Sequence, residues 1–337
     1  MTLKWSENYK RSYRITVGTR ETTIAKWTVD AAIVVKEKVT ENDYLNKPSN
    51  ARILSNLAED NASQRGFTFK LDAKHKATSK GSKGEVSTLD LFGLDEDLIK
   101  VINQDECIVI VEAGYQGQVE VAYTGDVKRV TSFRQGADMV HRLHCASGAT
   151  DMRSTHARLS YDEEMPYNDI IEDMFGRMPN TTLGILGLKH LKDRKKTGGR
   201  HFNGKLCSSL ERIAEENNLY WSHFNGKIVV IPLRLQDEDY ELFSATNYTL
   251  DINSIKQITD TSDRKNFAAS DTKPKLKKLQ INTYYLPVDI GQFVTIPASK
   301  YTKETQGTYQ VKGRRCVLES QGTAWDVVLE LDELENS

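Results

Sequence analysis

The chain has 337 residues, with 46 basic and 47 acidic side chains, so its formal net charge at pH 7 is −1. This balance excludes the strong charge excess of a dedicated binder of nucleic acid or of a charged membrane surface. No apolar run approaches the length of a membrane span, and the first residues lack an apolar signal core. We therefore expect no membrane insertion and no recognition of a specific nucleic-acid sequence.

The N-terminal part predicts strands at YRITVG (13–18), WTVDAAIVV (27–35) and FTFKLDA (67–73). The segment 74–84 then has five basic side chains, two glycines and no acid. We expect a mobile hairpin tip or arm there, because this composition offers little apolar surface to bury. Its charge suits docking on an acidic neighbour, on which the arm would become ordered. The predicted interface residues are Lys74, Lys76, Lys80 and Lys83.

Two sets of three strands follow the same pattern along the chain. The first set spans 108–145: an apolar run, a turn at Ala113-Gly114-Tyr115, an alternating second strand and a third strand over 139–145. The second set comprises 288–297, 307–320 and 323–332. This repetition predicts two related small antiparallel β-barrels, with 108–145 and 291–331 superposing as equivalent parts.

A helical segment separates the two strand sets. Pro166 is well placed to start a helix with an apolar stripe, and 206–217 predicts a second amphipathic helix. Asn225-Gly226 between LYWSHF and KIVVIP is a strong hairpin signal. We therefore expect an α+β, mainly β chain in three parts. These are a first β-barrel domain over 1–155, a compact helix-plus-hairpin α/β domain over 156–235 and a second β-barrel domain over 236–337.

The cysteines, at positions 107, 145, 207 and 316, show no short paired spacing. This pattern is typical of free, mostly buried thiols in a protein that folds in the cytoplasm. His141, His144 and Cys145 suggest a metal site at first sight. Residues three apart on a strand point to opposite faces, however, so we expect no metal there and no other cofactor.

Two other functions remain open from the residues alone. Glu163, Glu164 and Asp169 could serve a cell-wall hydrolase, although carboxylates before a proline-started helix also stabilise its N-terminal end. A carbohydrate-binding β-protein could use Trp5, Trp27, Trp221 and Trp325 as stacking platforms, whereas alternating strands favour core packing for the last two. The basic clusters 74–83, 192–200 and 273–278 lack interleaved aromatic residues, which favours solvated or protein-docking loops over nucleic-acid binding.

The order of these motifs resembles the phage protein D family, the central baseplate hubs of long-tailed bacteriophages, related to the hub part of type VI secretion spike proteins. The resemblance rests on Ala113-Gly114-Tyr115, on Tyr123 to Val127, on the strand and short helix at 87–102, on the helix and hairpin at 202–232, and on the closing strands TYQVKGRRCVLESQGTAWDVVLEL. It covers most of residues 87–332.

This resemblance implies a structural virion protein without enzymatic activity. Such a hub is a homotrimer whose two barrels per subunit form a pseudo-sixfold ring around the tail lumen, joining the hexameric tail tube to the trimeric spike. The implied partners are further copies of the chain, the tail tube ring, the spike, other baseplate proteins and the tape-measure protein in the lumen. The implied location is the tail baseplate of the virion, assembled in the cytoplasm of the host bacterium.

Overall fold

The computed structural model describes residues 10–19, 49–58, 60, 64–65, 67–78, 86–178, 181–186, 199–232, 247–262 and 277–333. Most of this part is β-structure with short helices, which confirms the predicted mainly β composition. Within it, no helix has the length and apolar character needed to cross a membrane. The predicted strand at 27–35 lies outside the described residues.

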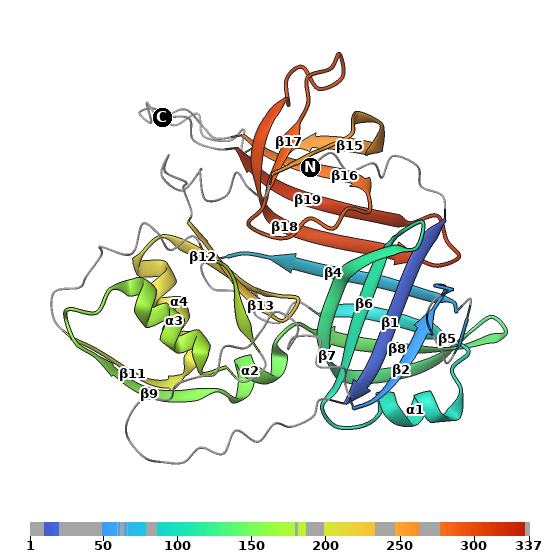
Figure 1. Cartoon of the computed structure of the whole chain (residues 1–337), viewed down its shortest axis with the longest axis horizontal. Coiled ribbons are helices and arrows are strands. Elements are labelled where there is room, and N and C mark those ends of the chain that lie inside the picture. Colours follow the sequence, from blue (N-terminus) through green and yellow to red (C-terminus); the bar gives the residue numbers. More distant parts are fainter. Residues whose placement is uncertain are drawn as a thin grey trace.

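One large mixed sheet dominates the fold (Figure 1). In spatial order its strands are β15 (Ile255–Asp260), β16 (Lys278–Tyr284), β19 (Trp325–Glu333), β18 (Gly307–Glu319), β4 (Phe69–Lys76), β5 (Ser87–Phe92), β8 (Asp138–Ala146), β7 (Gln118–Gln135), β6 (Cys107–Tyr115), β1 (Arg11–Thr19), β2 (Ser49–Ser55) and β3 (Gln64–Arg65). Two further strands, β14 (Asn247–Thr249) and β17 (Phe293–Ile296), branch from β18.

The N-terminal and C-terminal strand groups meet in this sheet, at a seam between β4 and β18. The strands pair antiparallel from Lys70 opposite Glu319 to Lys76 opposite Gly313. In Figure 1, β4 lies directly beneath β18 and extends toward the middle segment. Among the described strands the pairing follows an open path, so the expected pair of closed barrels is not confirmed. The superposition of 108–145 on 291–331 stays a prediction.

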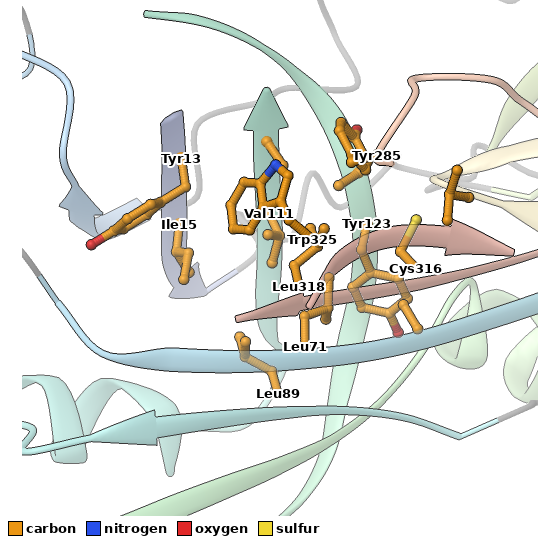
Figure 2. Packing of buried hydrophobic residues seen from close by; sticks show 14 of the residues in the cluster. Tyr13, Ile15, Leu71, Leu89, Val111, Tyr123, Tyr285, Cys316, Leu318 and Trp325 are labelled. Carbon is orange, nitrogen blue, oxygen red and sulfur yellow. The ribbon is translucent and has the colours of Figure 1, made fainter. Parts of the chain in front are cut away.

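Both halves also share one hydrophobic core. Trp325 on β19 is fully buried, with its ring centroid 6.2 Å from Phe69 on β4 and 6.5 Å from Tyr285. Figure 2 shows side chains from β1, β4, β6, β7, β18 and β19 converging around it. Arg11 on β1 lies over the same indole at 5.5 Å. The core therefore joins the strands on both sides of the seam into one body.

The strand β7 belongs to two pairings in turn. Its first half pairs with β6, from Gln118 to Asp126, and its second half pairs with β8, from Asp126 to Gln135. The register shifts between Val127 and Arg129, where the strand passes from one partner to the other. The second half consequently has β8 on one side only among the described strands.

The described residues between 149 and 232, here called the middle segment, have their own smaller core. It contains β9 (His156–Tyr161), β10 (Thr182–Leu186), β11 (Arg200–Lys205), β12 (Leu219–Phe224), β13 (Lys227–Pro232), α2 (Ala149–Ser154), α3 (Tyr167–Gly176) and α4 (Leu206–Glu216). The predicted helices and the Asn225-Gly226 hairpin are confirmed, with both turn residues at positive φ. The apolar faces of α3 and α4 pack against β12 and β13. Two short helical elements, α1 (Glu96–Ile102) and η3 (Ile252–Ser254), lie outside this segment.

The first residues of the predicted basic arm belong to a strand. Lys74 and Lys76 belong to β4, because residues 70–76 continue the ladder with β18 as far as Gly313. The alternation of FTFKLDA therefore runs on into the basic residues, with His75 on the buried face and Lys74 exposed. Lys80 and Lys83 lie outside the described residues.

Candidate functional site

The residues considered for chemistry are spread over separate surfaces. His141 and His144 lie on opposite faces of β8, as predicted: the His141 Nδ1 contacts Ser132 Oγ at 2.8 Å, whereas the His144 Nε2 contacts Thr131 Oγ1 at 3.3 Å. Within the described part of the chain, no three His, Cys, Asp or Glu side chains converge in a way that could hold a metal ion.

The carboxylates of the hydrolase hypothesis surround the start of α3. Glu163, Glu164 and Asp169 are all exposed there. The neighbouring Asp162 accepts hydrogen bonds from the backbone N–H groups of Glu164 and Met165, at 3.1 and 3.0 Å. This arrangement is that of a turn leading into a helix, with favourable negative charge at its N-terminal end.

The tryptophans of the carbohydrate hypothesis divide into two groups. Trp221 and Trp325 are 3% and 0% exposed, so neither presents a ring to a sugar. Trp5 and Trp27 lie outside the described residues. Cys107, Cys145 and Cys316 are buried free thiols, and Cys207 is a half-buried one.

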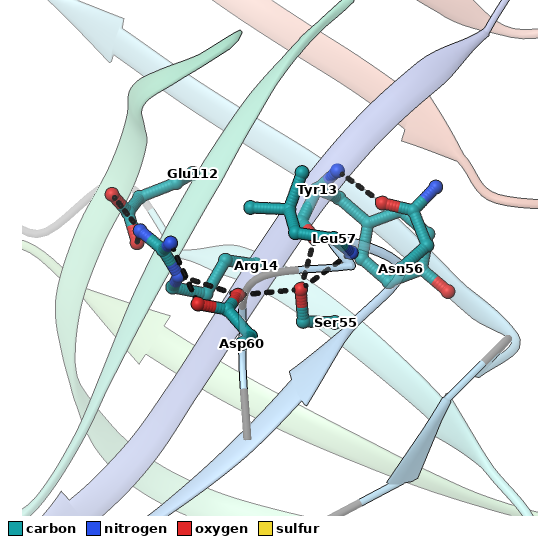
Figure 3. Close-up of polar contacts among 7 residues, drawn as sticks. All are labelled: Tyr13, Arg14, Ser55, Asn56, Leu57, Asp60 and Glu112. Atoms are coloured by element: carbon teal, nitrogen blue, oxygen red, sulfur yellow. Dashed lines mark hydrogen bonds and ion pairs between the residues drawn. The ribbon is translucent and has the colours of Figure 1, made fainter. Parts of the chain in front are cut away.

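An ion-pair network fixes β1 between its neighbours (Figure 3). Arg14 donates to both carboxylate oxygens of Asp60 at 2.8 Å and to Glu112 on β6 at 3.2 Å. Ser55 Oγ donates to Asp60 at 2.7 Å, and these hydrogen bonds hold the pKa of Asp60 below its usual value. The N-terminal strand is thus bound both to the sheet interior and to the segment after β2.

The β12–β13 hairpin joins the middle segment to the large sheet. Thr78, beyond the end of β4, exchanges two backbone hydrogen bonds with Trp221 on β12, at 3.3 and 3.0 Å. At the hairpin turn, Asn225 Oδ1 accepts a hydrogen bond from Thr124 N on β7 at 3.0 Å. Lys312 Nζ on β18 donates to Pro232 O at the end of β13 at 3.0 Å. One hairpin therefore contacts three strands of the sheet.

Buried basic groups surround this junction. Arg314 on β18 is 2% exposed, donates to Ala122 O at 3.0 Å and lies 5.5 Å from the Phe224 ring. His75 packs against Phe224 with ring centroids 4.9 Å apart, and its Nε2 has no hydrogen-bond partner among the described residues. Burial, together with the nearby charges of Arg314 and His223, lowers the pKa of His75 from 6.5 to about 3.

A second buried network holds the chain between β8 and α2 against the hairpin. His223 on β12 contacts Ser147 Oγ through Nδ1 at 2.8 Å and Thr181 Oγ1 through Nε2 at 3.0 Å. Thr181 in turn donates to Asp151 at 2.5 Å. Gly148 adopts φ +61°, and a Cβ at this position would lie 2.3 Å from the His223 ring. The imidazole can approach this closely only because residue 148 has no side chain.

On the exposed face of the seam, acidic and basic side chains of neighbouring strands form ion pairs. Lys70 pairs with Glu319 at 2.7 Å, and Lys76 with Glu330 at 2.5 Å. Arg315 forms a bidentate contact with Asp72 at 2.8 and 2.7 Å. Each such exposed pair contributes only about 0–1 kcal/mol to stability. Their more evident effect is to leave this polar face nearly neutral.

The sheet has one open edge along the second half of β7. In an antiparallel ladder, successive residues direct their N–H and C=O groups to opposite edges of the strand. Met139 O accepts a hydrogen bond from Gly93 N at 3.2 Å, so the Met139 backbone faces β5 and its partner Arg134 faces away from β8. By alternation the backbones of Ser132 and Val130 also point to the open edge.

In the strand order β15-β16-β19-β18-β4-β5-β8-β7, the strand at the opposite end from β7 is β15. Thr261 N donates to Lys278 O at 2.8 Å, so Thr261, and by alternation Thr259, face β16. Asp260 between them, and by the same alternation Ile258, direct their N–H and C=O groups outward. No described strand pairs with this side of β15. Two outward-facing edges therefore end the run from β15 to β7.

No known family model and no curated protein matches the sequence. The fold is similar to the 43 kDa tail protein of prophage MuSo2 from Shewanella oneidensis, with a TM-score of 0.52 at 9% identity over 80% of this chain and 95% of that chain. It is also similar to a chain of the half-lidded PdpA–VgrG complex from Francisella, with a TM-score of 0.56 at 8% identity over 98% of this chain and 59% of that chain. At the level of fold, the resemblance to phage tail proteins is confirmed.

No sequence motif identifies the junction. His75 lies in the segment predicted to form a basic arm, yet the fold brings it to the β12–β13 hairpin, where His223 also lies. The one signal available was period-two alternation, which places His75 in phase with Phe69, Leu71 and Ala73 on the buried face of β4.

We expect Gly148→Ala to destabilise the protein more than Gly136→Ala. Both glycines have φ near +60°, at 61° and 63°, but a Cβ at Gly136 meets no atom within 4 Å. The two variants therefore share the backbone strain, and only Gly148→Ala adds the collision with His223, a difference of about 1–3 kcal/mol. Urea denaturation of both variants measures this difference. Equal losses would mean that His223 moves aside freely.

We also expect His75 to make the protein acid-sensitive. Its folded-state pKa lies below the unfolded value of 6.5, so its neutral form stabilises the fold above that pH, and this contribution is lost as pH falls toward about 3. His75→Phe should flatten the decline in unfolding free energy below pH 6.5, by roughly 2 kcal/mol at pH 5. His201→Phe, at an exposed position, is the matched control and should keep the wild-type decline. Parallel curves for all three proteins would contradict the role of His75.

Proposed function

We propose that this chain is a structural tail hub: a homotrimer that forms a ring around the tail lumen, in the baseplate of a phage-type virion. The observation that carries the proposal is the run β15-β16-β19-β18-β4-β5-β8-β7. Every neighbouring pair in this run is antiparallel, and both outer edges are open among the described strands. The run is an even number of alternating strands, so its two end strands point in opposite directions and can pair antiparallel between copies.

The same run supports a pseudo-sixfold ring. The seam divides it into two groups of four strands, β15-β16-β19-β18 from the C-terminal half and β4-β5-β8-β7 from the N-terminal half. Three copies therefore supply six four-stranded units, which match a hexameric tube ring, while the threefold symmetry of the whole matches a trimeric spike. This arrangement removes the exposed sheet edges that otherwise promote aggregation.

The role is that of an adaptor without enzymatic activity. Its partners in the proposal are the tail tube ring, the spike and other baseplate proteins, with the tape-measure protein in the lumen. The polar face of the seam would face that lumen, where its paired charges avoid a basic surface that binds DNA by counterion release. Lys74, Lys76, Lys80 and Lys83 remain the predicted contacts to an acidic neighbour, and Lys76 also pairs with Glu330 within the chain. The protein would fold in the host bacterial cytoplasm before it joins the virion.

Native mass spectrometry of the purified full chain tests the oligomeric state. We expect a complex of three copies, because the two open edges of each copy then find partners in a closed ring. A monomer at micromolar concentration, or a dimer with twofold symmetry, would overturn the proposed hub.

Ser132→Pro should abolish this complex while keeping the fold of the single chain. The Ser132 N–H points to the open edge of β7, so proline removes a donor only from the intersubunit ladder and is tolerated at a free edge. Ser132→Ala is the matched control, since it removes the same hydroxyl contact to His141 but retains the N–H. Native mass and circular dichroism compare the two. Trimers from both variants would show that this edge takes no part in assembly.

A further inference from the structure

We propose that the second half of β7 in one copy pairs with β15 of a second copy, in the register that sets Val130 opposite Ile258. This inference rests on the proposed trimer and specifies which residues form its contact. It follows from three properties of the two edges: the direction of their backbone groups, the faces of their side chains and the charges beside them.

The backbone directions are compatible in this register. Val130 and Ile258 both direct their N–H and C=O groups to the open edges, as the hydrogen bonds of Met139 and Thr261 establish. Set opposite each other, they form a pair that exchanges two hydrogen bonds. A shift by one residue would oppose an outward-facing residue to an inward-facing one and would leave the new ladder without donors.

The side-chain faces select among the remaining registers. Val130 and Ile258 are both half-buried and pack against the shared hydrophobic core. Placed opposite each other, they continue the apolar face of the sheet from one copy to the next and cover each other's exposed side. Thr131 and Gln257 then face each other on the exposed side of the sheet, one residue away.

Charge disfavours the neighbouring registers. A shift by two residues in one direction sets Val130 opposite Asp260, and in the other direction it sets Val130 opposite Lys256. Both shifts replace an apolar pair by an apolar residue facing an ionic one. The proposed register also brings the basic pair Lys128-Arg129 near Asp260, whose charge is opposite.

Cysteine pairs test the register directly. Thr131→Cys with Gln257→Cys places thiols at directly opposed positions without mutual hydrogen bonds, where the Cβ atoms of an antiparallel pair come closest. The matched controls are Thr131→Cys with Thr259→Cys and Arg129→Cys with Gln257→Cys, which report the two shifted registers. The native thiols of Cys107, Cys145 and Cys316 are buried, and each single variant measures any background from Cys207.

We expect disulfide-linked dimers and trimers on a non-reducing gel from the first pair and only background from the two controls. Native mass spectrometry of the same samples separates the possible failures. A trimer that links through a control pair would overturn the register and leave the hub proposal standing. A trimer in which no pair links would show that other surfaces join the copies. A wild-type chain that forms no trimer would overturn both proposals.

Discussion

The antiparallel ladder between β4 and β18 is the interaction on which the rest of the molecule depends. It joins the N-terminal and C-terminal strand groups into one sheet and places their apolar faces over a single core around Trp325. The same ladder carries His75 and Arg314 to the junction, because they are opposite each other in its register. Without the seam, neither the shared core nor the attachment of the middle segment would form.

The junction shows how polar groups can be buried at a meeting point of three parts. The β12–β13 hairpin forms hydrogen bonds with the backbone of Thr78, just beyond β4, and with the backbone N–H of Thr124 on β7, and it accepts one from the Lys312 side chain on β18. Lys312 and Arg314 are both buried there, and burial lowers the pKa of Lys312 to about 8. The direct hydrogen bonds of these cations go to carbonyl and amide oxygens, with aromatic rings packed beside them. Such packing accepts a cost in desolvation and gives the hairpin one defined position.

Local features were predictable from the sequence, whereas contacts between distant segments were not. The strand alternations, the helix at 206–217 and the Asn225-Gly226 turn depend on neighbouring residues, and all of them are confirmed. The seam depends on two strands more than two hundred positions apart, and no local pattern identifies the partner of an edge. The seam itself was not predicted for the same reason. Lys76 was expected in a mobile arm, whereas β18 and Glu330 hold it in the sheet.

The distance along the chain between the two sides of the seam has a consequence for synthesis. Arg315 and Asp72 are 243 positions apart in the sequence, yet they form a bidentate ion pair. Ladders of this kind close late, because a long loop must be ordered before the first contact forms. A ribosome-bound chain that has not yet emerged beyond residue 319 cannot present both sheet edges at the correct spacing. Ring formation would then begin only after β18 has been synthesised and has closed the seam, which limits premature association between partly synthesised chains.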